Sequence, residues 1–195
     1  MIPSADEAAR GGGRAREGTA LKLLNDFDAE YEQQLDEARA RAHASGRSDV
    51  VEYLNLRAAN DALRAAGIES LLESFSAHAG ELNRAGAGLH ITRAEAHRFK
   101  VGNSTMVGPR LVFRVGLREL TVEAGWPRGP RDGIVRGGGL AAALVGHFGN
   151  RAAGEELLLV PAPEGPPRWL VIEKTGERAE LRDERIKRHF TKLFI

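Results

Sequence analysis

Proline is absent from the chain between Pro3 and Pro109, although the sequence contains eight prolines. The remaining six all follow Pro109 and are Pro127, Pro130, Pro161, Pro163, Pro166 and Pro167. Proline removes a main-chain donor and breaks the interior of a helix, so its distribution favours long helices in the first half only. We therefore expect a helical N-terminal half, followed by a second half built from shorter elements.

Residues 19–44 carry one apolar stripe with spacings of three and four, which predicts a long amphipathic helix. The stripe consists of Leu24, Phe27, Tyr31, Leu35, Ala38 and Ala42. Gly46 and Ser48 then interrupt the pattern, and a second helical run begins near Asp49. Two helices joined by so short a loop predict an antiparallel hairpin.

The hairpin, a coiled-coil arm, is assigned to residues 19–87 and follows a polar, glycine-containing segment at 1–18 that we expect to be disordered. Gly67 interrupts the second helical run, at a cost of about 1 kcal/mol relative to alanine. The sequence therefore leaves open whether the arm is one hairpin or contains a kink or a third helix at this glycine.

A β-hairpin is predicted between Arg110 and Ala124, where apolar and polar residues alternate with period two on both sides of a glycine turn. On the polar face of this hairpin, Arg110 would lie across from Glu123. Arg114 would lie across from Glu119. Such pairs of opposite charge stabilise an antiparallel sheet and neutralise part of its basic surface.

The remainder of the second half predicts two more strands, at 157–160 and 169–172. A short buried helix is expected at 139–145, and a basic amphipathic helix at 181–194. The predicted fold class is α+β, in which the helical arm precedes a small β-rich domain with a terminal helix, residues 88–195.

Composition excludes several classes of site. The chain has no cysteine, which rules out disulfides, thiolate metal sites and cysteine nucleophiles. The N-terminal residues contain no apolar run of the kind that targets or anchors a chain, so we expect a cytoplasmic protein that does not contact membranes.

Catalytic motifs are weak or missing. The run from Gly137 to Ala142 fits the dinucleotide pattern G-x-G-x-x-A, but only a minimal strand precedes it, and we interpret it as a structural glycine turn. The six histidines lack the spacing of a metal site, and His147 is interpreted as a structural residue. We therefore expect no enzymatic activity and no resident cofactor.

Charge is distributed unevenly along the chain. Residues 1–87 contain 10 basic and 15 acidic side chains, whereas residues 88–136 contain 9 basic and 4 acidic ones. The basic excess suggests one face of the sheet as a candidate nucleic-acid surface. Its residues would be Arg110, Arg114, Arg128, Arg131 and Arg136.

Two carboxylates mark the tip of the predicted arm. Asp49 and Glu52 are three residues apart and would both project from the first turn of the second helix. There they complement the helix dipole, and Asp49 could also help to hold Mg²⁺ against a substrate phosphate. Arg47 and Tyr53 are the tip neighbours.

The layout of a helical hairpin, an acidic tip and a small β-rich domain resembles that of the bacterial Gre transcript-cleavage factors, over most of residues 19–174. The similar segments follow one another in the family's order and are Asp49-Val-Val-Glu-Tyr53, Gly80-Glu-Leu-Asn-Arg-Ala85, Leu89-His-Ile-Thr92, Val101-Gly-Asn-Ser-Thr105, Gly139-Leu-Ala-Ala-Ala-Leu-Val-Gly146, Gly154-Glu-Glu-Leu-Leu-Leu159, Pro163-Glu-Gly165 and Arg168-Trp-Leu-Val-Ile-Glu173. The resemblance implies an FKBP-like sheet domain and a coiled-coil arm that enters the secondary channel of RNA polymerase.

At the tip the chain departs from the family pattern. Gly46 or Arg47 replaces the first of two metal-contacting acids, so that only Asp49 remains. A single carboxylate beside an arginine is a poor Mg²⁺ site. The resemblance therefore implies a regulator of transcription elongation that binds RNA polymerase without efficient stimulation of cleavage. A homo-oligomeric interaction module and a nucleic-acid-binding protein are the alternatives, and the sequence does not decide between monomer and homo-oligomer.

Overall fold

The computed structural model describes residues 33–195. The expected tail at 1–18 and the first helix as far as residue 32 lie outside the described residues. The chain divides into two compact units, of which the first ends at Ala58 and the second comprises Ala59–Ile195. In the first unit, residues 33–44 are helical, and a turn leads to the long helix α2 (Ser48–Arg84). The predicted break between the two helical runs is confirmed by Gly46, whose φ of 68° is the left-handed conformation that glycine tolerates.

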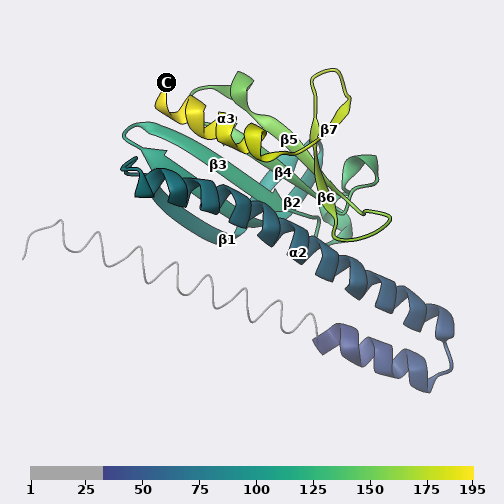
Figure 1. Cartoon of the computed structure of the whole chain (residues 1–195). Coiled ribbons are helices and arrows are strands. Elements are labelled where there is room, and N and C mark those ends of the chain that lie inside the picture. Colours follow the sequence, from purple (N-terminus) through teal and green to yellow (C-terminus); the bar gives the residue numbers. More distant parts are fainter. Residues whose placement is uncertain (1–32) are drawn as a thin grey trace, which may run out of the picture. The chain divides into compact units, whose positions relative to one another are not determined.

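The second unit is built on one antiparallel sheet of seven strands, in which each strand pairs with its neighbours in the sequence (Figure 1). The strands are β1 (His90–Val101), β2 (Ser104–Val115), β3 (Arg118–Gly125), β4 (Ala141–His147), β5 (Glu155–Val160), β6 (Arg168–Ile172) and β7 (Arg178–Glu180). The C-terminal helix α3 (Asp183–Phe194) follows the last strand. The α+β class and the terminal helix are thus as predicted, and no helix of the described residues is apolar over a length that would cross a membrane.

The main core lies between one face of the sheet and the two helices. From α2, Ile68, Leu71, Leu72, Phe75 and Ala79 are buried in it, and α3 adds Ile186, Phe190 and Leu193. Aromatic rings connect the layers, because Phe113 of β2 packs edge-on against Phe190 at a centroid distance of 5.1 Å and stacks with Phe75 at 6.4 Å. The half of α2 that follows Ala58 therefore belongs to the sheet unit.

This packing places the unit boundary well before the predicted domain boundary at 87/88. The apolar stripe of the second helical run was assigned to an arm, but its residues from Ile68 onward form the helical layer of the sheet core. A helix in a coiled-coil arm and a helix packed on a sheet show the same apolar periodicity. The periodicity indicates that one face of the helix is buried, but not which element buries it.

Helix α2 continues through Gly67 without a break. A Cβ atom at this position would lie 2.6 Å from Leu159 Cδ2, so the helix approaches β5 more closely than any larger residue would allow. Gly67 thus allows a close contact between helix and sheet, and no third helix begins there.

The expected short helix at 139–145 is wrong, because residues Ala141–His147 form strand β4. Ala141, Ala143 and Val145 face the main core, while Ala142 joins a second small cluster with Phe99, Val101 and Met106. Both faces of β4 are covered, and such a strand reads as a continuous apolar run without period-two alternation.

Strand β1 forms one edge of the sheet. Its pairing with β2 shifts register between Ala94 and His97, and the strand carries Arg93, Glu95 and Arg98. A bulge and charged side chains are features that prevent an edge strand from pairing with another chain.

Candidate functional site

The predicted tip residues lie together around the turn between the two helical segments of the first unit. Arg47 precedes α2, Asp49 lies in its first turn, and Glu52 and Tyr53 follow within the next turn. All four side chains are exposed. Arg47 Nη2 lies 3.8 Å from Asp49 Oδ2, so the arginine partly neutralises the acid that was proposed as a metal ligand.

Among residues 33–195, no group of three or more histidine, aspartate or glutamate side chains is arranged to hold a metal ion. The guanidinium of Arg47 beside Asp49 repels a metal cation, which makes this carboxylate a poor metal ligand by itself. A role for Asp49 in binding Mg²⁺ therefore requires ligands from another molecule.

The predicted basic face is divided by the fold. Arg110 and Arg114 lie on β2, and their registered partners are Glu123 and Glu119, as the alternation predicted. Arg114 Nη2 donates to Glu119 Oε2 at 2.6 Å, so this half of the face is largely neutralised.

The other three arginines lie on the connection between β3 and β4 rather than on a strand. Arg128 stacks over Trp126 with its Cζ atom 3.7 Å from the ring centroid. Arg131 and Arg136 belong to short 3-10 turns, Pro130–Asp132 and Arg136–Gly138. The five arginines consequently do not form one continuous strand face.

The glycine run that follows Arg136 is a turn and leads into β4, not into a helix. Gly137 and Gly138 both have φ near 73°, and the carbonyl oxygen of Gly137 accepts a hydrogen bond from Arg178 Nη2 at 3.2 Å. Without a helix N-terminus, the backbone N–H groups are not aligned as a phosphate site requires, which agrees with the interpretation as a structural turn.

One polar arrangement of five residues in the second unit has no signal in the sequence. It connects β4, β5, the residue after β6, and α3 in one chain of contacts. His147 Nε2 lies 2.9 Å from His189 Nδ1, and His189 Nε2 lies 3.2 Å from Glu155 Oε2. Glu155 accepts a hydrogen bond of 2.8 Å from Arg185 Nε, and Arg185 also donates to both oxygens of Glu173, at 2.5 and 3.1 Å. We call these five residues the His–Glu–Arg network.

The direction of the hydrogen bond between the two rings depends on which ring nitrogen of each histidine carries the proton. A proton on His189 Nε2 would face Glu155 Oε2, and a carboxylate can only accept. No sequence pattern indicates this pair, since the two histidines are far apart in the chain and only the packing of α3 against the sheet brings them together.

Burial and neighbouring charges lower the pKa of two members of the network, His147 and Glu155. Burial of the ring lowers the pKa of His147 to about 4, assisted by the neighbouring His189 and Lys192. Burial also opposes ionisation of Glu155, but hydrogen bonds from His189 and Arg185 outweigh it and lower its pKa to about 2. His147 is therefore neutral and Glu155 ionised, and a ring with so low a pKa is a poor general base at neutral pH.

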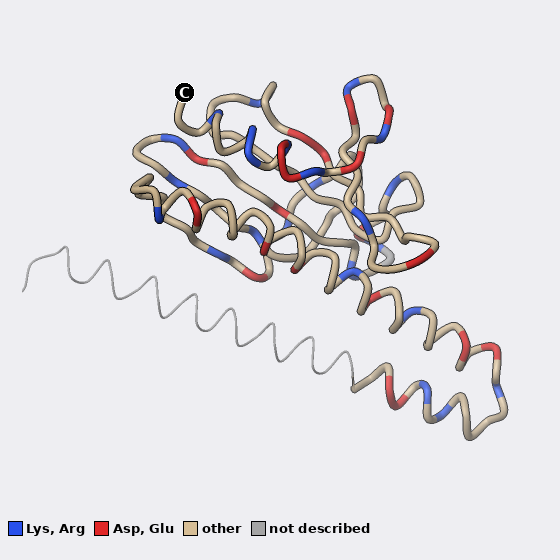
Figure 2. Tube along the Cα trace, viewed as in Figure 1, with Lys and Arg blue, Asp and Glu red and all other residues tan. Residues whose placement is uncertain are grey.

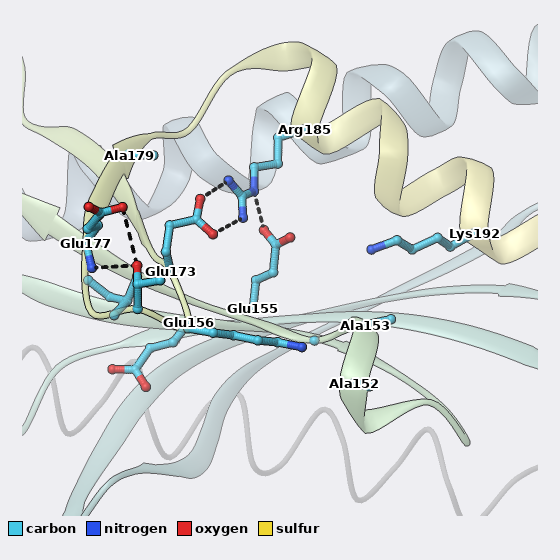
Figure 3. A pocket seen from close by; sticks show the side chains of 13 residues that line it. Ala152, Ala153, Glu155, Glu156, Glu173, Glu177, Ala179, Arg185 and Lys192 are labelled. Atoms are coloured by element: carbon cyan, nitrogen blue, oxygen red, sulfur yellow. Dashed lines mark hydrogen bonds and ion pairs between the residues drawn. The ribbon is translucent and has the colours of Figure 1, made fainter.

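An open pocket of about 620 Å³ borders the network (Figure 3). Figure 3 shows Arg185 between Glu155 and Glu173, with Lys192 directed toward the same space from the following turns of α3. Seven of the residues that line it are charged, and three of these, Glu155, Glu173 and Arg185, are paired with one another. The hydrogen bonds of Arg185 hold α3 against the sheet, and none of the residues that line the pocket is an activated nucleophile.

In comparisons with known proteins, no family model, no curated protein and no solved structure matches the chain.

Proposed function

We propose that this chain is a non-enzymatic protein-binding module, that it contacts its partner with the exposed residues that follow the Gly46 turn, and that the partner is bacterial RNA polymerase. The identity of the partner comes from the resemblance to Gre factors. The observation that carries the binding role is the exposure of Tyr53 and Leu56, each 61 % accessible.

Tyr53 and Leu56 are three residues apart on α2 and therefore share one side of the helix. Leu54, between them, is only 8 % accessible, so this segment of the helix has a buried side that does not include Tyr53 and Leu56. These two side chains are therefore available to a partner. A tyrosine beside an aliphatic residue, flanked by Asp49 and Glu52, has the composition of a binding hot spot with a charged rim.

The proposal includes binding without efficient stimulation of transcript cleavage. Arg47 lies beside Asp49, and no second acid stands at the tip in the way the Gre pattern requires. A cation at this position repels Mg²⁺, so the module would occupy its site on the polymerase without delivering a metal ion.

Co-sedimentation of the full chain with purified bacterial RNA polymerase tests the proposal. We expect binding by the parent chain, and a loss of at least about tenfold in affinity for the Tyr53→Ala, Leu56→Ala double variant, as is typical of hot-spot residues. The matched control is Ile134→Ala, which removes an equally exposed aliphatic side chain, 74 % accessible, from a different segment. Absence of binding by the parent chain would overturn the choice of partner.

Self-association is the second candidate, because the same two exposed side chains would serve a second copy of the chain equally well. Light scattering distinguishes the two functions. A dimer of the parent chain that dissociates in the Tyr53→Ala, Leu56→Ala variant would assign these residues to homo-oligomerisation, whereas a monomer that binds polymerase supports the first function.

A further inference from the structure

Four large apolar side chains are exposed at one end of the sheet in the second unit. Leu117, in the turn between β2 and β3, is 96 % accessible, and Phe148, after β4, is 78 % accessible. Phe194 and Ile195, at the end of α3, are 44 % and 83 % accessible. In the described part of the chain, nine large apolar residues are exposed. Four of the nine therefore belong to the three segments that meet at this end of the sheet.

Hydrogen bonds bring the three segments together. Arg118, next to Leu117, donates from Nη2 to the carbonyl oxygen of Ile195 at 2.7 Å. The amide of Phe148 donates to the carbonyl oxygen of Glu119 at 2.9 Å. The β2–β3 turn is therefore attached to both of the other segments, and Figure 1 shows the end of α3 beside this end of the sheet.

The same three segments are basic. Residues 114–119, 147–153 and 188–195 contain five arginine or lysine residues and one acid, Glu119. That acid is already bound by Arg114 at 2.6 Å and is only 16 % accessible. The basic residues are Arg114, Arg118, Arg151, Arg188 and Lys192, and the acids of α3 are confined to its first turn (Figure 2).

In contrast to the expectation that the protein does not contact membranes, we propose that this end of the sheet binds an anionic lipid surface, with Leu117 and Phe148 inserted among the lipid headgroups and the exposed Arg151 and Arg188 held against the lipid phosphates. Apolar side chains on separate turns need no complementary groove to be buried in a fluid interface. The positive rim matches the negative potential of anionic lipids. A second copy of the chain is a poor occupant, because two positive rims would face each other across a symmetric interface.

Vesicle co-sedimentation with the full chain, without polymerase, tests this surface independently of the proposed function. We expect binding to vesicles that contain phosphatidylserine and, by comparison, at least about tenfold weaker binding to vesicles of phosphatidylcholine alone. Added salt should weaken the binding, since it screens the basic rim. Equal binding to both vesicle types, or none to either at low salt, would overturn the proposal.

Two pairs of matched variants locate the contact. The double variant Leu117→Ser, Phe148→Ser should reduce vesicle binding by about tenfold or more, whereas Ile134→Ser should leave vesicle binding unchanged. Arg151→Glu should reduce binding by about fivefold or more, whereas Arg131→Glu, on the β3–β4 connection, should not.

Circular dichroism and thermal melting of each variant establish that the fold is kept. Full vesicle binding by the folded Leu117→Ser, Phe148→Ser variant would contradict the proposal. The proposal would also be contradicted if the chain does not bind vesicles but binds a synthetic acidic amphipathic helix through Leu117 and Phe148. That result would assign the surface to a protein partner.

Discussion

Trp169 of β6 donates a hydrogen bond from its indole Nε1 to the main-chain carbonyl oxygen of Gly67 in α2, over 2.8 Å. The two residues are 102 positions apart in the sequence. The indole can reach the backbone of α2 at this point because Gly67 has no side chain in the way. A hydrogen bond between buried groups therefore marks a close approach of helix and sheet, and a side chain at position 67 would collide with Leu159.

Gly67→Ala should destabilise the fold although alanine favours a helix. The new Cβ would lie 2.6 and 2.8 Å from the two methyl carbons of the fully buried Leu159. Overpacking of this kind costs about 1–3 kcal/mol, against a gain of about 1 kcal/mol in helix propensity. We expect a net loss of up to about 2 kcal/mol in the free energy of unfolding, measured by urea denaturation.

Gly80→Ala, in the same helix, is the matched control. A Cβ at position 80 would have Arg84 Nη1 as its nearest neighbour, at 3.7 Å, so the propensity gain should appear as a stabilisation of up to about 1 kcal/mol. Equal effects of the two substitutions would contradict the close approach of α2 to Leu159.

His147→Gln should flatten the dependence of stability on pH between about 6.5 and 4. The folded pKa of His147 is about 4, whereas the ordinary value is 6.5, so in this window the unfolded chain binds more protons and stability falls as pH falls. Glutamine keeps a donor for His189 but does not titrate. Allowing for solvent screening of this half-buried ring, the difference should be on the order of 1 kcal/mol.

Denaturation at several pH values measures that difference. Glu155 provides an internal control, because its folded pKa of about 2 lies below the ordinary 4.5. Its contribution is present above pH 4.5, is lost as pH falls toward 2, and should persist in the His147→Gln variant. An unchanged slope above pH 4.5 would show that His147 titrates equally in the folded and unfolded chain.

Arg185→Met should weaken the attachment of α3 to the sheet. It leaves Glu155 partly buried beside His189 without its arginine donor, and removes the two hydrogen bonds to Glu173. Removing one partner of a partly buried charge pair costs about 1–3 kcal/mol. Lys187→Met, at an exposed position of the same helix, should change the free energy of unfolding by less than about 0.5 kcal/mol.

Ser104→Ala should loosen the connection between β3 and β4. Ser104 Oγ donates to the carbonyl oxygen of Ile134 at 2.8 Å and accepts from its amide at 3.3 Å. Loss of both contacts should cost about 1–2 kcal/mol and speed hydrogen exchange of the Ile134 amide. Exchange of the Leu89 amide, which donates to Asn83 Oδ1, should be unaffected and serves as the reference.

The β2–β3 hairpin could be predicted to the level of individual pairs, because one of its faces is buried and the other carries opposite charges. Arg110 opposite Glu123 and Arg114 opposite Glu119 follow from that alternation alone. Strand β4 could not be recognised, since both of its faces are covered and its three alanines also favour a helix. Strand β1 carries charged residues over most of its length and shows a bulge, which removes the period-two signal.

The tip residues and the His–Glu–Arg network also differ in how far the sequence predicts them. The tip residues around Asp49 were found because they are close in sequence, within one turn of a helix. The His–Glu–Arg network draws its members from β4, β5, the residue after β6, and α3, so no local sequence pattern indicates it. His147 and His189 come into contact only once the sheet register and the docking of α3 are set.

The neighbour-to-neighbour order of the seven strands has a consequence for how the chain is made. Each strand pairs with the one synthesised just before it, so the sheet can assemble one hairpin at a time during translation, without long loops to close. Helix α2 is synthesised before any strand, yet the partners of Phe75, which are Phe113 and Phe190, come from β2 and from the last helix. We therefore expect the apolar face of α2 to be covered only in part until α3 is made at the end of synthesis, so that a chaperone on the ribosome would protect this helix.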